Sequence, residues 1–204
     1  MGKNDYFEFC VSQMNYCCLS SELLCDVLKG RYVKDIDQAI VKNDELCKNA
    51  LRLYDETKVK LSKEFITPLE HNDFLILLQN ILYIHNEIKN IMSLLSVYHI
   101  HEVFNNLNEM SLLLNDINQS LKSILIELKN YKKSDKLKLL FIEVKTFGYL
   151  ADKKYKEGLE ELINKTYDYK KIITYHKVYD YFKRNFDLCV YTSDMIEQII
   201  MRNT

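Results

Sequence analysis

A chain of 204 residues is long enough to bury a substantial hydrophobic core, either as one domain or as two small repeats. Its 28 basic and 29 acidic residues give a net charge of −1, which lacks the positive excess typical of nucleic-acid-binding proteins. Four Gly and one Pro are few for this length, and their scarcity favours long helices joined by short loops.

The first half of the chain contains three helical patterns. The first helix is predicted over residues 4–29, and Gly30 directly after it ends the helix. The second helix is predicted over residues 33–64. We expect the third helix to begin at Thr67, which with Glu70 forms a capping box, while Pro68 occupies the first helical position. Its apolar residues recur every three or four positions as far as residue 95.

The second half repeats this organisation. A shift of the apolar register predicts a turn at residues 97–101, and the fourth helix then runs from residue 103 to 128. Polar residues 130–135 end it, with Ser134 or Asp135 as the next N-cap. The fifth helix extends to about residue 164 and the sixth covers residues 170–201. No segment alternates as a strand does, so the prediction is an all-α protein of six long antiparallel helices.

The chain lacks signals for membrane insertion or secretion. No apolar run approaches the roughly 20 residues of a membrane span, and residues 1–6 contain neither a secretory apolar stretch nor the Ser or Thr that myristoylation needs where Tyr6 stands. We therefore expect a cytoplasmic protein. Its six cysteines form no C-x-x-C pair, and we interpret them as small buried thiols: Cys10, Cys17, Cys18, Cys25, Cys47 and Cys189.

Residues 65–73, with the sequence FITPLEHND, resemble the FITP-x-[DE]-R-[DE]-D signature of the PhoU-like phosphate transport regulators. In the second half, residues 151–159 are similar to the A-D-x-x-Y-R-x-A-L motif of that family, residues 178–180 to I-Y-E and residues 187–189 to D-R-C. The resemblance implies one domain over residues 1–204 with the fold of two similar three-helix bundles, as a pseudo-repeat of residues 1–98 and 99–204.

The resemblance also implies where metal ligands would lie. PhoU-like proteins bind metal ions through four E/D-x-x-x-D motifs, because residues i and i+4 share a helical face. The corresponding pairs in this chain are Cys47/Leu51, Leu82/Asn86, Gly148/Asp152 and Lys183/Asp187. Asp152 and Asp187 are thus the remaining candidate ligands for a divalent or ferric ion, and we expect no family-type metal cluster. Asp44, seven residues before Leu51, lies near the same face and could contribute if the register shifted.

The sequence lacks the motifs of a di-iron site, a phosphate-binding loop and a catalytic site. No Glu has a His three positions later, as a di-iron bundle would require. No Gly-rich phosphate loop or nucleophile–base pattern is present, and we expect no enzyme. Ten tyrosines from residue 98 onward form either an exposed interface belt or the edge of a core: Tyr98, Tyr131, Tyr149, Tyr155, Tyr167, Tyr169, Tyr175, Tyr179, Tyr181 and Tyr191.

By resemblance, the chain would act as a regulator or accessory protein of an inorganic phosphate transporter. It would bind the transporter or a signalling protein, reach the membrane only through that partner, and hold no cofactor. Two alternatives stay open: a metal-binding helical protein for storage or sensing, and a scaffold that has lost the phosphate link. Self-association as a homo-oligomer is also left open.

Overall fold

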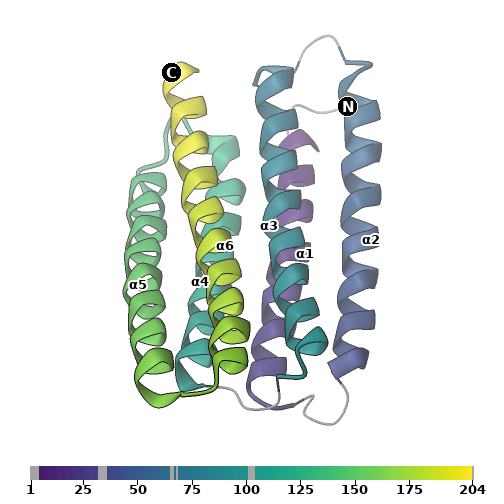
Figure 1. Cartoon of the computed structure of the whole chain (residues 1–204). Coiled ribbons are helices and arrows are strands. Elements are labelled where there is room, and N and C mark those ends of the chain that lie inside the picture. The colour runs from purple at the N-terminus through teal and green to yellow at the C-terminus, as the bar shows by residue number, and fades with distance from the viewer. Residues whose placement is uncertain (1–4, 32–35, 65–66, 68, 101–103, 204) are drawn as a thin grey trace.

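The computed structural model describes residues 5–31, 36–64, 67, 69–100 and 104–203. All regular structure in these residues is helical, which confirms the predicted all-α class. The helices run alternately up and down along one axis (Figure 1). Their bounds are α1 Asp5–Leu28, α2 Ile36–Leu61, α3 His71–Val97, α4 Asn105–Glu127, α5 Lys136–Lys165 and α6 Tyr169–Arg202, with a short 3-10 helix, η1, at Leu128–Asn130.

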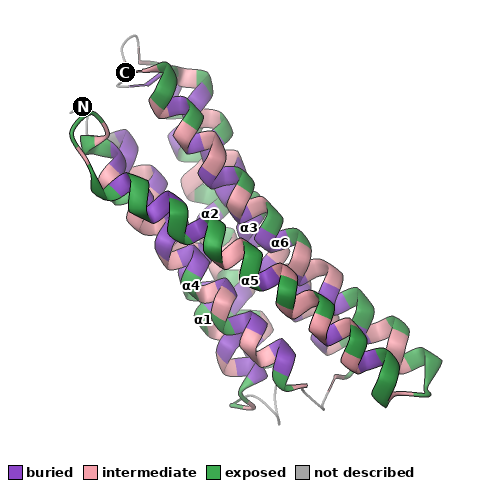
Figure 2. Cartoon of the chain, turned by 90° about the vertical axis from the view of Figure 1, so that its left-hand side faces the viewer, coloured by how far each residue is buried: buried purple, intermediate pink, exposed green. Residues whose placement is uncertain are grey.

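The helices pack as two sets of three that share one core. Helices α1, α2 and α3 contact one another, and so do α4, α5 and α6. Contacts of α1 with α4 and of α3 with α6 join the two sets, while α2 and α5 lie at opposite sides of the bundle (Figure 1). The buried apolar side chains of all six helices form one continuous cluster, and exposed residues follow the outer faces (Figure 2).

Two equivalent hydrogen bonds relate the halves. The hydroxyl of Tyr54 donates to Gln79 Oε1 at 2.8 Å across α2 and α3. The hydroxyl of Tyr155 donates to Asp180 Oδ1 at 2.9 Å across α5 and α6. Both members of the second pair come 101 residues after those of the first. The division into repeats of residues 1–98 and 99–204 stays a prediction, and this correspondence supports it.

The predicted start of the third helix is wrong. Helix α3 begins at His71, four residues after Thr67, and its N-cap residue Glu70 makes no side-chain capping bond. The Thr67 hydroxyl instead donates to the Leu69 carbonyl at 2.5 Å, and His71 Nε2 donates to the Glu64 carbonyl at 2.8 Å. The hydroxyl therefore serves the turn that precedes the helix and is not free to cap it. Phe65, Ile66 and Pro68 of the signature lie outside the described residues.

Two helices are followed by a left-handed residue, of which Gly30 was predicted and His99 was not. Gly30 has φ 82°, and its N–H donates to the Val27 carbonyl at 3.0 Å, in the arrangement that commonly ends a helix. His99 has φ 51° in the predicted turn after α3, where its N–H donates to the Ser96 carbonyl at 2.9 Å. These caps satisfy carbonyls that the helices leave without an internal partner.

The start of α6 offers a test of capping in this fold. The Asp168 carboxylate accepts hydrogen bonds from the backbone N–H groups of Lys170, at 2.9 Å, and Lys171, at 3.3 Å. We expect Asp168→Ala to lower the free energy of unfolding by about 1 kcal/mol in urea denaturation. Asp135→Ala is the matched control, because Asp135 is the N-cap residue of α5 but makes no such bond. Equal losses in both variants would contradict this role for Asp168.

Candidate functional site

The two predicted metal ligands lie close together, on either side of a lysine ammonium. Asp152 is on α5, while Lys183 and Asp187 are one turn apart on α6. Lys183 Nζ lies 3.1 Å from Asp152 Oδ1 and also pairs with Asp187 Oδ1. A cation of the protein itself therefore contacts both carboxylates of the family motif positions.

The environment of Lys183 keeps its ammonium charged. The side chain is 29% exposed, and this partial burial lowers the pKa of Lys183. The hydrogen bonds to Asp187 and Asp152 and the negative charges of these two carboxylates together raise the pKa by more, so that it lies above its ordinary value. In the described part of the chain, no group of three or more His, Cys, Asp or Glu side chains is placed to hold a metal ion. Metal binding at Asp152 and Asp187 stays a prediction.

The missing acid of the third motif has a steric explanation. A Cβ atom at Gly148 would lie 2.6 Å from Val190 Cγ2, because α5 and α6 approach closely there. Valine has one strongly preferred side-chain rotamer in a helix, so Val190 cannot readily turn away. Restoring the carboxylate at this position would require the two helices to separate or Val190 to become smaller.

This close approach predicts a rescue experiment. Gly148→Asp is expected to lower the free energy of unfolding by roughly 1–3 kcal/mol, as overpacking of closely packed sites does. Combining it with Val190→Ala should recover most of the loss relative to Val190→Ala alone, in a double-mutant cycle followed by urea denaturation. If Gly148→Asp is as stable as the wild-type protein, the steric explanation fails.

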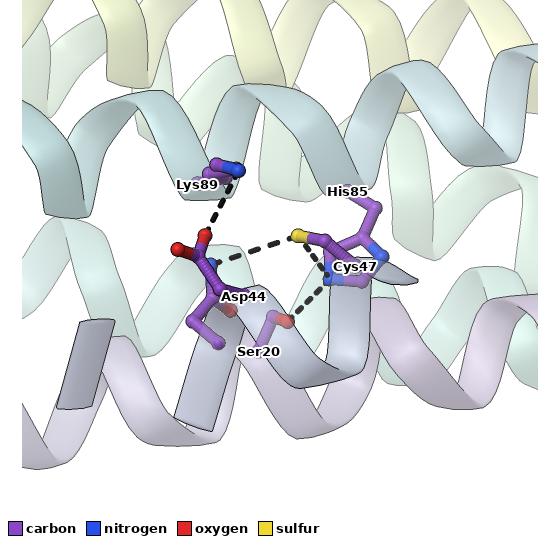
Figure 3. A network of polar contacts seen from close by, with 6 residues as sticks. Ser20, Asp44, Cys47, His85 and Lys89 are labelled. Carbon is purple, nitrogen blue, oxygen red and sulfur yellow. Dashed lines mark hydrogen bonds and ion pairs between the residues drawn. The ribbon is translucent and has the colours of Figure 1, made fainter. Parts of the chain in front are cut away.

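In the first half, one motif position, Cys47, belongs to a network of a different kind. Cys47 Sγ lies 3.4 Å from His85 Nε2, and Ser20 Oγ lies 2.7 Å from the same nitrogen (Figure 3). Helices α1, α2 and α3 each contribute one of these three residues. At the other motif positions Leu51 and Asn86 are exposed and Leu82 is buried, so no carboxylate replaces the lost ligands.

Cys47 and His85 form a neutral pair. Burial, and then the charge of Lys89, lowers the pKa of His85 to about 4. Burial raises the pKa of Cys47 to about 11 despite the opposing effect of Lys89. Cysteine-dependent enzymes use a thiolate, which a nearby imidazolium or another cation commonly stabilises. The thiol and imidazole found here lack that activation, and the other five cysteines are buried, as predicted.

Asp44 does not join the motif positions. Its carboxylate lies 2.8 Å from Lys89 Nζ, which draws it toward α3 one turn away from His85 (Figure 3). Each half of the protein thus pairs a carboxylate near a motif position with a lysine of the neighbouring helix: Asp44 with Lys89, and Asp152 with Lys183.

Sequence reasoning missed His85 as part of a site. It lies on the apolar stripe of α3 beside Ile81 and Ile88, and only 1% of it is exposed. A polar residue within an apolar stripe is a usable signal, because buried polar groups need partners. Its partners could not be read from the sequence, since Ser20 comes 65 residues earlier and Cys47 38 residues earlier.

The tyrosines divide between the two interpretations. Tyr175 and Tyr179 are buried in the core, and Tyr131, Tyr155 and Tyr181 are half-buried. The exposed ones are Tyr98, Tyr149, Tyr167, Tyr169 and Tyr191. The second half therefore uses tyrosine both in its core and on its surface.

The overall fold is that of PhoU-like proteins. A PhoU-like protein from Shewanella oneidensis MR-1 superposes with a TM-score of 0.81 at 15% identity, covering 96% of this chain and 99% of that one. A proposed PhoU-like phosphate regulatory protein from the same organism gives a TM-score of 0.80 at 15% identity, covering 97% of this chain and 99% of that one. The family resemblance in the sequence is thereby confirmed at the level of the fold.

A relative by sequence is the UPF0111 protein YkaA of Bacillus subtilis strain 168. It is 25% identical over 146 residues, which cover 71% of this chain and 70% of YkaA. No family model matches the chain. Among the helices of the described residues, none combines the length and apolar character needed to cross a membrane.

Proposed function

We propose that this protein regulates or assists an inorganic phosphate transporter by direct contact with the transporter or a signalling partner, without a bound metal ion and without catalysis. The fold supports the first part of this proposal, since it is shared with a proposed phosphate regulatory protein. The observation that carries the proposal that no metal ion is bound is the position of Lys183 between Asp152 and Asp187.

The ammonium of Lys183 makes a metal ion unnecessary for the integrity of this region. Two carboxylates facing each other across α5 and α6 would repel one another without a cation between them. Lys183 supplies that cation from within the chain, and its two ion pairs link the helices. A metal ion at this position would have to displace the ammonium of Lys183, and its side-chain ligands would then be the carboxylates of Asp152 and Asp187 alone.

A contact surface for a partner lies on the side of the bundle opposite α5. A groove of about 440 Å³ runs between α1 and α2, with Leu19, Leu23 and Leu46 among its lining residues. Three carboxylates, Glu22, Asp26 and Glu45, and one cation, Lys42, line this groove, and Arg31 pairs with Asp26 at 2.9 Å. Its apolar and acidic lining is complementary to a basic amphipathic segment, and the cytoplasmic loops of membrane proteins are rich in Lys and Arg.

Regulation through such a contact needs no chemistry. A protein that binds one conformation of a transporter more tightly than another shifts the equilibrium toward the conformation that it binds. The groove then determines which partner segment is bound, and the shape of the bundle determines which conformation of the partner is compatible with binding.

The test is phosphate uptake by cells that naturally make this protein. Removing the gene is expected to change the rate of uptake, and the wild-type gene should restore it. Leu19→Asp, which places a charge in the groove, should not restore it. Val59→Asp is the matched control, because Val59 on α2 is about as exposed as Leu19 on α1 but does not line the groove. Unchanged uptake after removal of the gene would overturn the proposal.

A further inference from the structure

Positive charge is concentrated at the connection between α4 and α5. Residues 129–138 contain five lysines and one acid, Asp135, in a chain whose net charge is −1. All five lysines are exposed, and none forms an ion pair with any residue that the structure describes. We call residues 129–138 the basic turn, and its lysines are Lys129, Lys132, Lys133, Lys136 and Lys138.

The basic turn is an ordered part of the bundle. The N–H groups of Tyr131 and Lys133 donate to the carbonyls of Leu128, at 3.2 Å, and Asn130, at 2.9 Å. The Tyr131 hydroxyl donates to the Asn203 carbonyl at 3.3 Å, which holds the turn against the end of α6. The turn lies at the end of the bundle where α6 finishes (Figure 1). Its lysines therefore extend from a fixed support.

Large apolar side chains follow the lysines on the first turns of α5. Leu139 is 69% exposed and Ile142 is 53% exposed. They are three residues apart, and Leu139 is three residues after Lys136, so all three lie on one side of the helix. Glu143 is the acidic residue of this part of α5, and Asp116 of α4 lies near it, against the five lysines of the basic turn.

We propose that the basic turn, together with Leu139 and Ile142, docks on the anionic surface of a lipid bilayer. Lysines close to an anionic leaflet are attracted to its phosphate headgroups, each raising binding about fivefold. Aliphatic side chains beside them can enter the boundary between headgroups and acyl chains. This contact is direct, whereas the sequence suggested that the membrane is reached only through a partner, and it is independent of the proposed phosphate regulation.

The pairing of lysines with aliphatic side chains favours lipid over nucleic acid. Proteins that bind single-stranded nucleic acid stack bases on aromatic side chains. The exposed apolar residues beside the basic turn are aliphatic, and the one aromatic side chain of the turn, Tyr131, is half-buried and bonded to Asn203. A bilayer surface can interact with both features, since its headgroups attract the lysines and its interface accommodates the aliphatic side chains.

The first test is co-sedimentation of the full chain with vesicles. Binding is expected to vesicles of phosphatidylcholine mixed with phosphatidylglycerol, and not to phosphatidylcholine alone. Lys132→Glu combined with Lys133→Glu should reduce binding at least tenfold, given two lysines at about fivefold each. The matched control combines Lys48→Glu with Lys170→Glu, two exposed lysines elsewhere on the bundle, and changes the net charge equally. Absence of binding to the anionic vesicles, or an equal loss in both variants, would overturn the proposal.

The second test places a fluorescent reporter at the docking surface. The chain contains no Trp, so Leu139→Trp introduces a single one. Its emission should shift to shorter wavelength when anionic vesicles are added and stay unchanged with phosphatidylcholine vesicles. Val41→Trp is the control, because Val41 is 66% exposed on α2 at the other side of the bundle. Equal shifts at both positions, or none at Leu139→Trp, would contradict docking through the start of α5.

Discussion

Replacing Lys183 with Glu is expected to create a divalent-cation site. The substitution removes the ammonium that contacts Asp152 and Asp187 and puts a third carboxylate in its place. Carboxylate oxygens are ligands that Mn²⁺ and Mg²⁺ prefer. Without metal, three nearby carboxylates repel, so the variant should melt at a lower temperature than the wild-type protein in chelator and be stabilised when Mn²⁺ is added.

The measurement is calorimetric titration of Mn²⁺ together with thermal unfolding in its presence and absence. We expect Lys183→Glu to bind close to one equivalent of Mn²⁺, at least tenfold more tightly than the wild-type protein. Lys183→Gln is the control, since it removes the ammonium without adding a ligand. If Lys183→Glu binds Mn²⁺ no better than Lys183→Gln, the two aspartates are not positioned as metal ligands. Stoichiometric binding by the wild-type protein would favour the metal-binding alternative.

The protein is expected to lose stability at acid pH because of His85. Burial, and then the charge of Lys89, lowers the pKa of His85 in the folded state to about 4, against an ordinary value of 6.5. Its Nδ1 has no hydrogen-bond partner among the described residues, so the imidazolium, which carries a proton on both ring nitrogens, would bury an N–H without an acceptor. Between these pKa values the unfolded chain binds a proton that the folded protein excludes, and stability falls as pH falls.

The expected size of this effect is about 2 kcal/mol at pH 4.5 relative to pH 7. It is isolated by comparison with His85→Gln, which keeps a polar side chain but does not titrate. The free energy of unfolding in urea should fall more steeply with acid in the wild-type protein than in this variant. Parallel curves for the two proteins would show that His85 does not stay neutral in the folded state.

The helices could be predicted because their apolar residues recur at the spacing of a helical face. Phe74, Leu77 and Ile81 illustrate this in α3, where burial against α1 and α6 follows the stripe. The start of that helix could not be predicted as reliably. A capping motif describes a local preference, whereas the Thr67 hydroxyl bonds to Leu69 and His71 bonds back to Glu64 in the turn that forms.

The candidate site was predictable in part. The motif spacing placed Asp152 and Asp187 at related positions and showed that Lys183 stands where an acid is expected. The contact of one ammonium with both carboxylates depends on the register between α5 and α6. Packing fixes that register, as the close approach of Gly148 to Val190 illustrates. The register between two helices cannot be predicted from the spacing of residues in one sequence.

The network around His85 was beyond sequence reasoning for the same reason. Ser20, Cys47 and His85 come from three helices, and only their packing brings the side chains together. The neutral state of the pair also depends on burial, which lowers the pKa of His85 and raises that of Cys47.

The central claim, regulation of phosphate transport by a PhoU-like fold that needs no metal ion, is tested most directly by phosphate uptake in cells lacking this protein. The cells receive either the wild-type gene or one encoding Asp152→Asn with Asp187→Asn, which removes both carboxylates of the motif positions. We predict that both genes restore the uptake rate of the parent cells to the same extent. The claim would be contradicted if the wild-type gene did not change uptake. It would also be contradicted if the wild-type gene restored uptake and the double variant, although stably folded, did not.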